Sequence, residues 1–138
     1  MLTYAAVQSI SNHIDRVKIL LILKENFPEK EIFAVGDMTE RYAFMAEEPM
    51  DEISDDYYKG SLAVILDTSA KSLISDTRYN LAERTVRIDH HIFVEKIADV
   101  ELTDTSYESC CGLIAEFARE NKLKLTSAAA KVIYTGMV

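Results

Sequence analysis

The chain has 138 residues, the size of one ordinary domain, and its 49% hydrophobic and 28% charged residues are typical of a soluble globular protein. The formal net charge of −8 and the isoelectric point of about 4.8 argue against tight binding of duplex nucleic acid through phosphate contacts alone. Only four glycines and two prolines occur, so no long flexible linker is expected.

The first half of the chain predicts two strands separated by a helix. Residues 2–7 predict a short strand. The helix begins near Ser11 or Asn12, which are both good N-cap residues, and it ends before Pro28, since proline disfavours helix in the residue before it. The remaining elements are, in order, a strand over 31–35, a short helical turn over 41–47 and an acidic surface connection over 49–59.

The second half begins with the clearest strand, residues 62–66, an unbroken aliphatic run of the kind found where both faces of a parallel sheet are covered. Residues 69–83 predict a loop or irregular helix, and residues 85–88 the next strand. Thr105 and Glu108 match a capping box that would open a helix. The last predictions are a strand over 99–102 and a helix over 128–137 that follows the N-cap candidate Thr126.

Strands therefore alternate with helices along the chain. This alternation is typical of βαβ units with right-handed crossovers, which build a mostly parallel sheet. The sequence predicts an α/β fold, a three-layer domain with a mostly parallel sheet.

The cysteines and the N-terminus bear on the cellular compartment. Cys110 and Cys111 are adjacent and are the only cysteines, and neighbouring cysteines rarely meet the geometry of a disulfide. The N-terminus lacks a basic segment followed by a long apolar one, so no signal peptide is expected. The most apolar run, residues 19–23, is too short to span a bilayer. We expect a cytoplasmic protein with no membrane partner.

Polar side chains that can bind metals follow two of the predicted strands. Asp67 comes directly after residues 62–66, and Asp89, His90 and His91 follow the strand over 85–88. Ligands of open parallel sheets bind beyond the carboxyl ends of the strands, so these side chains would form a metal and phosphate site. Carboxylate and imidazole ligands together suit Mn, Fe, Co or Zn better than Ca. Two metals that share a carboxylate can clamp a phosphoryl group.

A purely structural interpretation of these residues stays open. An aspartate after a strand is often the cap of the next helix, and Asp67 taken alone fits that role equally well. The combination of Asp89, His90 and His91 favours a site. Histidine is scarce in this chain, and two of its three histidines stand together beside a carboxylate.

The ordered set of motifs resembles the DHH phosphoesterases. Ile88-Asp89-His90-His91 is similar to the signature of that family, and the closest resemblance is to its branch of oligoribonucleases and 3′-phosphoadenosine 5′-phosphate phosphatases. The resemblance implies the fold of the N-terminal DHH domain. Other segments that match in the family's order are residues 27–30, 64–68, 104–106, 124–126 and 134–136.

Residue by residue, the resemblance implies parts of a two-metal Mn site. Asp67 is similar to the carboxylate that bridges the two Mn ions, and His90 is similar to a metal ligand. His91 resembles a catalytic imidazole that contacts the phosphate. Asp89 would assist catalysis by orienting the histidines. The segment that lines the substrate cleft in the family contributes Ser106 and Ser109.

The chain departs from the family pattern at two motifs. The first motif has a histidine followed by two aspartates, whereas Ala5, Ser9 and Ser11 fall at the matching positions. The aspartate of the fourth motif would come shortly after residues 134–136, and the chain ends at Val138. We therefore expect one DHH-like domain over residues 1–138, truncated relative to the family and without its C-terminal substrate-binding domain. Such a domain would hold at most one Mn ion.

Two functional hypotheses follow. In the first, the chain is a Mn-dependent hydrolase of phosphodiester or phosphomonoester bonds in short oligoribonucleotides or nucleotide phosphates, impaired by the missing ligands. In the second, it is a non-catalytic DHH-like binding or structural domain, or a fragment, that could act as a homodimer.

Overall fold

The computed structural model describes residues 3–8, 13–37 and 50–137. The helical turn predicted over 41–47 lies outside these ranges. The described elements, in chain order, are β1 (Thr3–Gln8), α1 (His13–Asn26), β2 (Ile32–Val35), η2 (Asp55–Tyr57), β3 (Ser61–Leu66), η3 (Lys71–Leu73), η4 (Thr77–Leu81), β4 (Arg84–Asp89), β5 (Val100–Thr103), α2 (Cys110–Glu120) and α3 (Ser127–Met137), where η marks a 3-10 helix.

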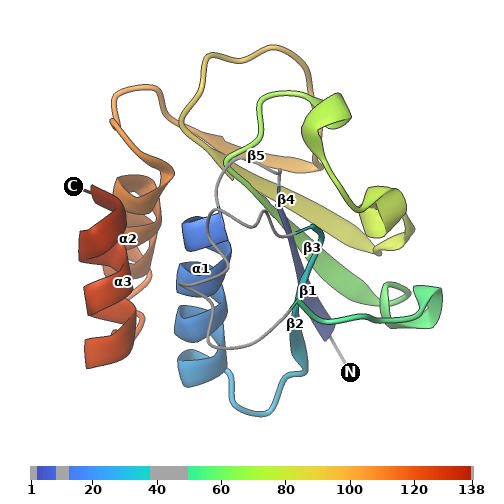
Figure 1. Cartoon of the computed structure of the whole chain (residues 1–138), viewed down its shortest axis with the longest axis horizontal. Helices are drawn as coiled ribbons and strands as arrows, with labels where there is room; N and C mark the ends of the chain where they lie inside the picture. The colour runs from blue at the N-terminus through green and yellow to red at the C-terminus, as the bar shows by residue number, and fades with distance from the viewer. Residues whose placement is uncertain (1–2, 9–12, 38–49, 138) are drawn as a thin grey trace.

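The strands form one five-stranded sheet in the order β2-β1-β3-β4-β5 (Figure 1). Every neighbouring pair is parallel, which confirms the predicted α/β fold with a parallel sheet. The register pairs Leu66 of β3 with Ile88 of β4. Asp67, which follows β3, and Asp89, the last residue of β4, therefore reach the same edge of the sheet.

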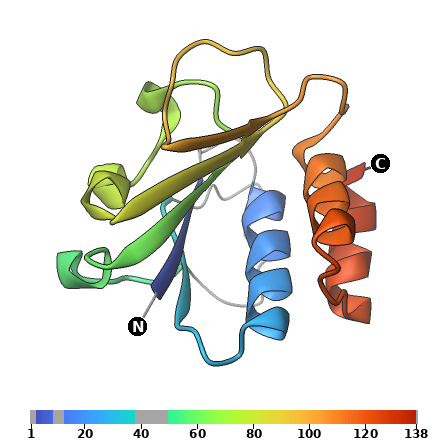
Figure 2. The same cartoon turned by 180° about the vertical axis from the view of Figure 1, so that it is seen from behind.

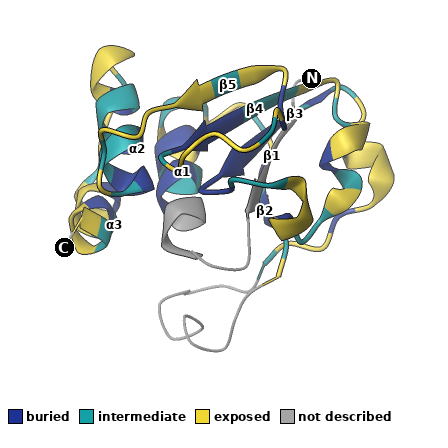
Figure 3. Cartoon of the chain, turned by 90° about the horizontal axis from the view of Figure 1, so that it is seen from above, coloured by how far each residue is buried: buried dark blue, intermediate teal, exposed yellow. Residues whose placement is uncertain are grey.

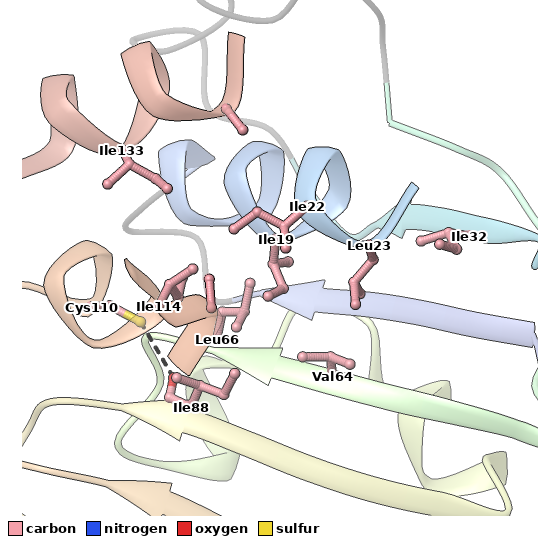
Figure 4. Packing of buried hydrophobic residues seen from close by; sticks show 12 residues of the cluster. Ile19, Ile22, Leu23, Ile32, Val64, Leu66, Ile88, Cys110, Ile114 and Ile133 are labelled. Atoms are coloured by element: carbon pink, nitrogen blue, oxygen red, sulfur yellow. Dashed lines mark hydrogen bonds between the residues drawn. The ribbon is translucent and has the colours of Figure 1, made fainter. Parts of the chain in front are cut away.

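Helices α1, α2 and α3 lie on one side of the sheet, and the connecting segments with η2, η3 and η4 lie on the other (Figures 1 and 2). Each side has its own apolar cluster. Ile19, Leu66 and Ile114 belong to the cluster under the helices, part of which Figure 4 shows. Ile65 and Tyr58 belong to the cluster on the opposite face. Strand β3 supplies residues to both clusters because successive side chains of a strand point to opposite faces.

Burial decreases from the centre of the sheet toward the edge strand β5 (Figure 3). The last four residues of β3 are all buried, whereas in β5 only Glu101 is partly covered. The unbroken aliphatic run over 62–66 predicts this burial, because such a run suits a strand that is covered on both faces. The predicted strand over 62–66 is thus the centre of the core.

The helix after β5 begins later than the capping box predicted. Helix α2 starts at Cys110, and the Ser109 hydroxyl accepts a hydrogen bond from the Gly112 N–H at 3.3 Å. Asp104 Oδ1 instead accepts bonds from the N–H and the hydroxyl of Ser106, which closes a local turn in the predicted box. The prediction was wrong because this turn competes with helix for the same residues. The predicted cap of α3 is confirmed, since the Ala129 N–H donates to Thr126 Oγ1 at 3.1 Å.

The three helices enclose a polar group between them. Lys18 of α1 is fully buried, and its Nζ donates to Cys111 Sγ of α2. Gly136 of α3 approaches both side chains so closely that a Cβ atom there would collide with them. Both cysteines are buried, and Cys110 Sγ contacts the Ile88 carbonyl at 3.4 Å (Figure 4). No helix within the described ranges has the length and apolarity needed to cross a membrane.

Candidate metal and phosphate site

Asp67 stands directly after β3 in an uncommon backbone conformation. Its φ of 52° lies in the left-handed region, which few residues other than glycine adopt. Its N–H still donates to the Ile88 carbonyl of β4 at 3.0 Å, so the sheet holds the turn in place. Strained backbone of this kind gathers at functional sites because the surrounding structure must hold it there. The carboxylate is buried at the carboxyl edge of the sheet, with 6% of the residue exposed.

The two histidines after β4 meet Asp67 at this edge. His90 Nε2 lies 3.2 Å from Asp67 Oδ1, and His91 Nδ1 lies 3.7 Å from the same oxygen. One potential ligand atom from each residue fits within a group whose members are all less than 4.8 Å apart. The structure therefore brings Asp67 together with His90 and His91, which lie 23 and 24 positions further along the chain.

The hydrogen bond on the other side of His90 decides which ring nitrogen can act as a ligand. His90 Nδ1 lies 3.2 Å from the Tyr107 carbonyl oxygen. A carbonyl only accepts, so Nδ1 must carry the proton, and Nε2 of the neutral ring then presents its lone pair toward Asp67. Two acceptors 3.2 Å apart are satisfied by a cation between them or by a second ring proton. This donor set fits a divalent metal, and a carbonyl that orients the ligating imidazole is the usual arrangement.

His91 is engaged differently. Its Nδ1 lies 2.6 Å from Asp89 Oδ1, so the proton on Nδ1 is donated to this carboxylate. Asp89 is only 1% exposed, whereas the His91 side chain is 46% exposed. The ring nitrogen left to meet a ligand is Nε2. The rings of His90 and His91 lie 4.3 Å apart between centroids, so the two imidazoles form one surface.

A buried arginine connects the segments that carry these side chains. Arg87 of β4 is fully buried, and its Nη1 donates to the carbonyl oxygens of Thr68 at 3.1 Å and Ser69 at 3.4 Å, directly after Asp67. The same nitrogen lies 3.9 Å from Asp89 Oδ2. Arg87 Nε also donates to Glu101 Oε2 of β5. One guanidinium thus fixes both strand ends of the site relative to each other.

The hydrogen bonds of Glu101 show how the charge of Arg87 is compensated. Burial alone would raise the pKa of Glu101, but hydrogen bonds from the N–H groups of Ala98 and Ile97 and from Arg87 outweigh it and lower the pKa below its ordinary value. The two N–H bonds are 2.9 and 2.7 Å long. A carboxylate held ionised in this way keeps the charge of Arg87 compensated.

The two predicted substrate-binding serines lie in the segment before α2, and their hydroxyls make local hydrogen bonds. The Ser106 hydroxyl donates to Asp104, and the Ser109 hydroxyl caps α2. Tyr107, between them, supplies the carbonyl that contacts His90. Their role toward a substrate stays a prediction, and Ser9 and Ser11 lie outside the described residues.

Sequence reasoning missed Arg87 and the Tyr107 carbonyl. Arg87 leaves a signal in the sequence, because it is the one charged residue inside the predicted strand over 85–88. A charged side chain in a buried strand needs a partner, and that need points to a polar network. The Tyr107 carbonyl leaves no signal, since any residue has one.

Comparison with known proteins gives a consistent result. The family model described as "DHH family, N-terminal domain" matches residues 2–137 of the chain. The chain is 37% identical over 120 residues to the "Bifunctional oligoribonuclease and PAP phosphatase NrnA" of Bacillus subtilis, covering 85% of this chain and 38% of that protein. It is 32% identical over 117 residues to the "Probable bifunctional oligoribonuclease and PAP phosphatase NrnA" of Streptococcus mutans, covering 85% of this chain and 37% of that one. The chain thus spans well under half the length of these relatives.

The fold also resembles that of a solved structure. The crystal structure of an exopolyphosphatase-related protein from Bacteroides fragilis matches with a TM-score of 0.75 and 18% sequence identity, covering 98% of this chain and 45% of that one. At this identity the likeness shows the fold alone.

Proposed function

Because the chain belongs to the DHH family, we propose that it binds Mn and the phosphate group of a nucleotide-type substrate at the Asp67–His90–His91 cluster, and that it hydrolyses this substrate only weakly. The observation that carries the proposal is the convergence of one carboxylate and two imidazoles at the carboxyl ends of β3 and β4. Ligands of parallel α/β sheets bind at this edge.

The hydrogen bonds that each side chain already makes indicate which atom of it can bind the ion and which can bind phosphate. Asp67 and His90 would hold the ion, since their facing atoms are 3.2 Å apart and His90 Nδ1 is committed to the Tyr107 carbonyl. A bound divalent ion supplies positive charge that stabilises a phosphoryl group under attack. His91 would contact a phosphate oxygen through Nε2, with Asp89 keeping the ring in position.

The substrate class follows from the relatives. Proteins named as oligoribonucleases and PAP phosphatases match this chain over most of its length. We infer short oligoribonucleotides or nucleotide phosphates such as 3′-phosphoadenosine 5′-phosphate as ligands. The net charge of −8 suits a small ligand better than duplex nucleic acid. Two adjacent cysteines, which rarely meet the geometry of a disulfide, suit the reducing cytoplasm, where we place the protein.

The weak turnover follows from the first motif. Two-metal hydrolysis needs enough anionic ligands to keep both ions close together. Ser9 and Ser11 are neutral hydroxyls where the family pattern has aspartates. Without these two carboxylates, at most one ion would be held, and only loosely. If no pair of metal ions is bound, the chain is a binding domain without turnover, and such a domain would act through dimerisation.

A hydrolysis assay with Mn tests the proposal. Wild type is compared with Asp67→Ala, His91→Ala and the double variant Ser9→Asp/Ser11→Asp, using a short oligoribonucleotide and 3′-phosphoadenosine 5′-phosphate. We expect little product from wild type, none above background from the two alanine variants, and a clear gain from the double variant. Robust wild-type activity that both alanine variants abolish would show that the site is not impaired. Wild-type activity unchanged in both would show that the cluster is not the site.

A further inference from the structure

Three exposed apolar residues directly follow the histidine pair. Ile92, Phe93 and Val94 are 80%, 57% and 65% exposed. Single exposed apolar residues are common, but neighbouring ones that form a continuous patch often mark a surface that binds another molecule. Their position next to His91 makes them part of the surroundings of the proposed phosphate site.

The ring of Phe93 packs against the guanidinium of Arg87. The guanidinium carbon of Arg87 lies 5.5 Å from the centroid of the Phe93 ring, within the range of a cation–π contact. Arg87 is fully buried, so it covers the inner side of the ring, and the exposed part of Phe93 faces outward. The result is a flat aromatic surface with one side supported and the other open.

The distances tie this ring to the site. The guanidinium that supports Phe93 also lies 3.9 Å from Asp89 Oδ2, and the other oxygen of Asp89 lies 2.6 Å from His91 Nδ1. Phe93 contacts Arg87 and His91 contacts Asp89, so the two rings are linked through a pair of buried groups that lie 3.9 Å apart. A ligand whose phosphate meets His91 would bring its remaining part over this neighbourhood.

We propose that Phe93 forms a nucleobase subsite, in which the base of the bound nucleotide stacks on the open face of its ring. The proposal rests on the function proposed above, which supplies the phosphate end of the ligand. A base presents a flat aromatic face, and stacking of bases on aromatic side chains is the common way in which proteins hold unpaired nucleotides. Because every base has such a face, this subsite would accept different bases.

The test compares two ligands that differ only in the base. Adenosine 5′-monophosphate and ribose 5-phosphate are titrated calorimetrically in the presence of Mn into wild type, Phe93→Ala, Phe93→Leu and Phe93→Trp. Tyr57→Ala is the control, since Tyr57 is an exposed aromatic residue that precedes β3, away from the edge where Asp67 lies. The chain has no tryptophan, so Phe93→Trp also places the only tryptophan of the chain at the subsite, where it can be excited selectively above the tyrosine absorption band.

We expect wild type and Tyr57→Ala to bind the adenosine ligand more tightly than ribose 5-phosphate. Phe93→Ala and Phe93→Leu should weaken the adenosine ligand by about 5- to 150-fold and leave ribose 5-phosphate unchanged. Phe93→Trp should keep the affinity, and its fluorescence should be quenched by the adenosine ligand alone.

Other outcomes separate the two proposals. If wild type binds both ligands equally, or if Phe93→Ala binds them as wild type does, the base subsite is wrong while the phosphate site stands. If wild type binds neither ligand, the proposed function fails and the subsite fails with it. If Phe93→Ala lowers the molar mass in solution measured by light scattering, the ring belongs to an interface between two copies, and the subsite is wrong.

Discussion

His91 Nδ1 lies 2.6 Å from Asp89 Oδ1, a contact that joins a half-exposed imidazole to a carboxylate that is almost fully buried. The buried partner is part of β4, and Arg87 of the same strand reaches both Asp89 and the backbone after Asp67. The orientation of the exposed ring is therefore set by the core of the sheet. Substitutions that leave His91 in place can still change what it does.

The first prediction concerns this contact. Asp89→Asn replaces the charged acceptor of the His91 Nδ1–H with a neutral amide, whose oxygen accepts a weaker hydrogen bond and whose NH2 can favour the other ring tautomer, so the His91 ring is held less firmly. Partners that orient a site imidazole typically contribute 10- to 100-fold to binding or activity, and we expect inorganic phosphate to bind about 10-fold more weakly when Mn is present. Calorimetric titration measures the change. Asp56→Asn, at an exposed carboxylate in η2, should bind phosphate as wild type does; equal affinity in Asp89→Asn would contradict the role of Asp89.

The second prediction concerns the metal. Mn at about ten times its dissociation constant should stabilise the folded chain by about 1.4 kcal/mol and raise the melting temperature by about 3–8 °C. His90→Ala should remove most of this rise because it deletes the nitrogen that faces Asp67 at 3.2 Å. Differential scanning fluorimetry over a Mn series measures the shift.

Asp56→Asn serves as the matched control for the metal experiment. Asp56 is an exposed carboxylate paired only with Lys59 in the described part of the chain, and its side chain lies in η2. Its variant should respond to Mn as wild type does. A full Mn shift in His90→Ala would show that the ion binds elsewhere on the acidic surface.

The third prediction concerns β3. Ile65 and Val64 are buried in the clusters on opposite faces of the sheet. Ile65→Ala should lower the free energy of unfolding by about 2–5 kcal/mol, and Val64→Ala should fall near the lower end of that range, because both leave cavities in a packed core. Urea unfolding gives the values. Val100→Ala, at a half-exposed position in β5, should change stability by less than about 0.5 kcal/mol; a similarly small change for both β3 variants would refute the central strand.

The fourth prediction concerns pH. The pKa of Glu101 in the folded chain lies below its ordinary value of 4.5. The unfolded chain therefore binds the proton first, so the stabilisation from Glu101 is complete above about pH 4.5 and is lost as the pH falls through the lower folded value. Glu101→Gln should be less stable than wild type by about 1–2 kcal/mol at pH 7. The difference should shrink below pH 4.5.

Urea unfolding at pH 7, 5, 4 and 3 measures this dependence. Glu52→Gln, at an exposed position, is the matched control and should follow the wild-type curve. A difference between wild type and Glu101→Gln that stays constant from pH 7 to pH 3 would show that Glu101 acts through packing and not through its charge.

Much of the fold could be predicted because its signals are local. The aliphatic run over 62–66 requires burial on both faces, and the helix caps depend on single side chains such as Thr126. The parallel pairing of β3 with β4 followed from the helix–strand alternation. These properties depend on the order of residue types along the chain, which the sequence displays directly.

For the site, too, some features could be predicted from the sequence and others could not. The sequence alone placed Asp67, Asp89, His90 and His91 at the ends of two strands, and parallel pairing then brings them to one edge. Only the tertiary structure shows which atoms these side chains present to one another. His90 faces Asp67 because the Tyr107 carbonyl occupies its other nitrogen. Such contacts arise between segments that pack together only after the sheet has formed.

Arg87 shows the reason most clearly. In the sequence it is a single charge within an apolar strand, and nothing along the chain shows what compensates it. In the folded protein it meets Glu101, Asp89 and the Thr68 carbonyl, and the ring of Phe93 covers its guanidinium. Burial makes each of these partners necessary, since an uncompensated charge in the core is strongly unfavourable. Residue order specifies which side chains reach the site, and packing specifies which atoms they present there.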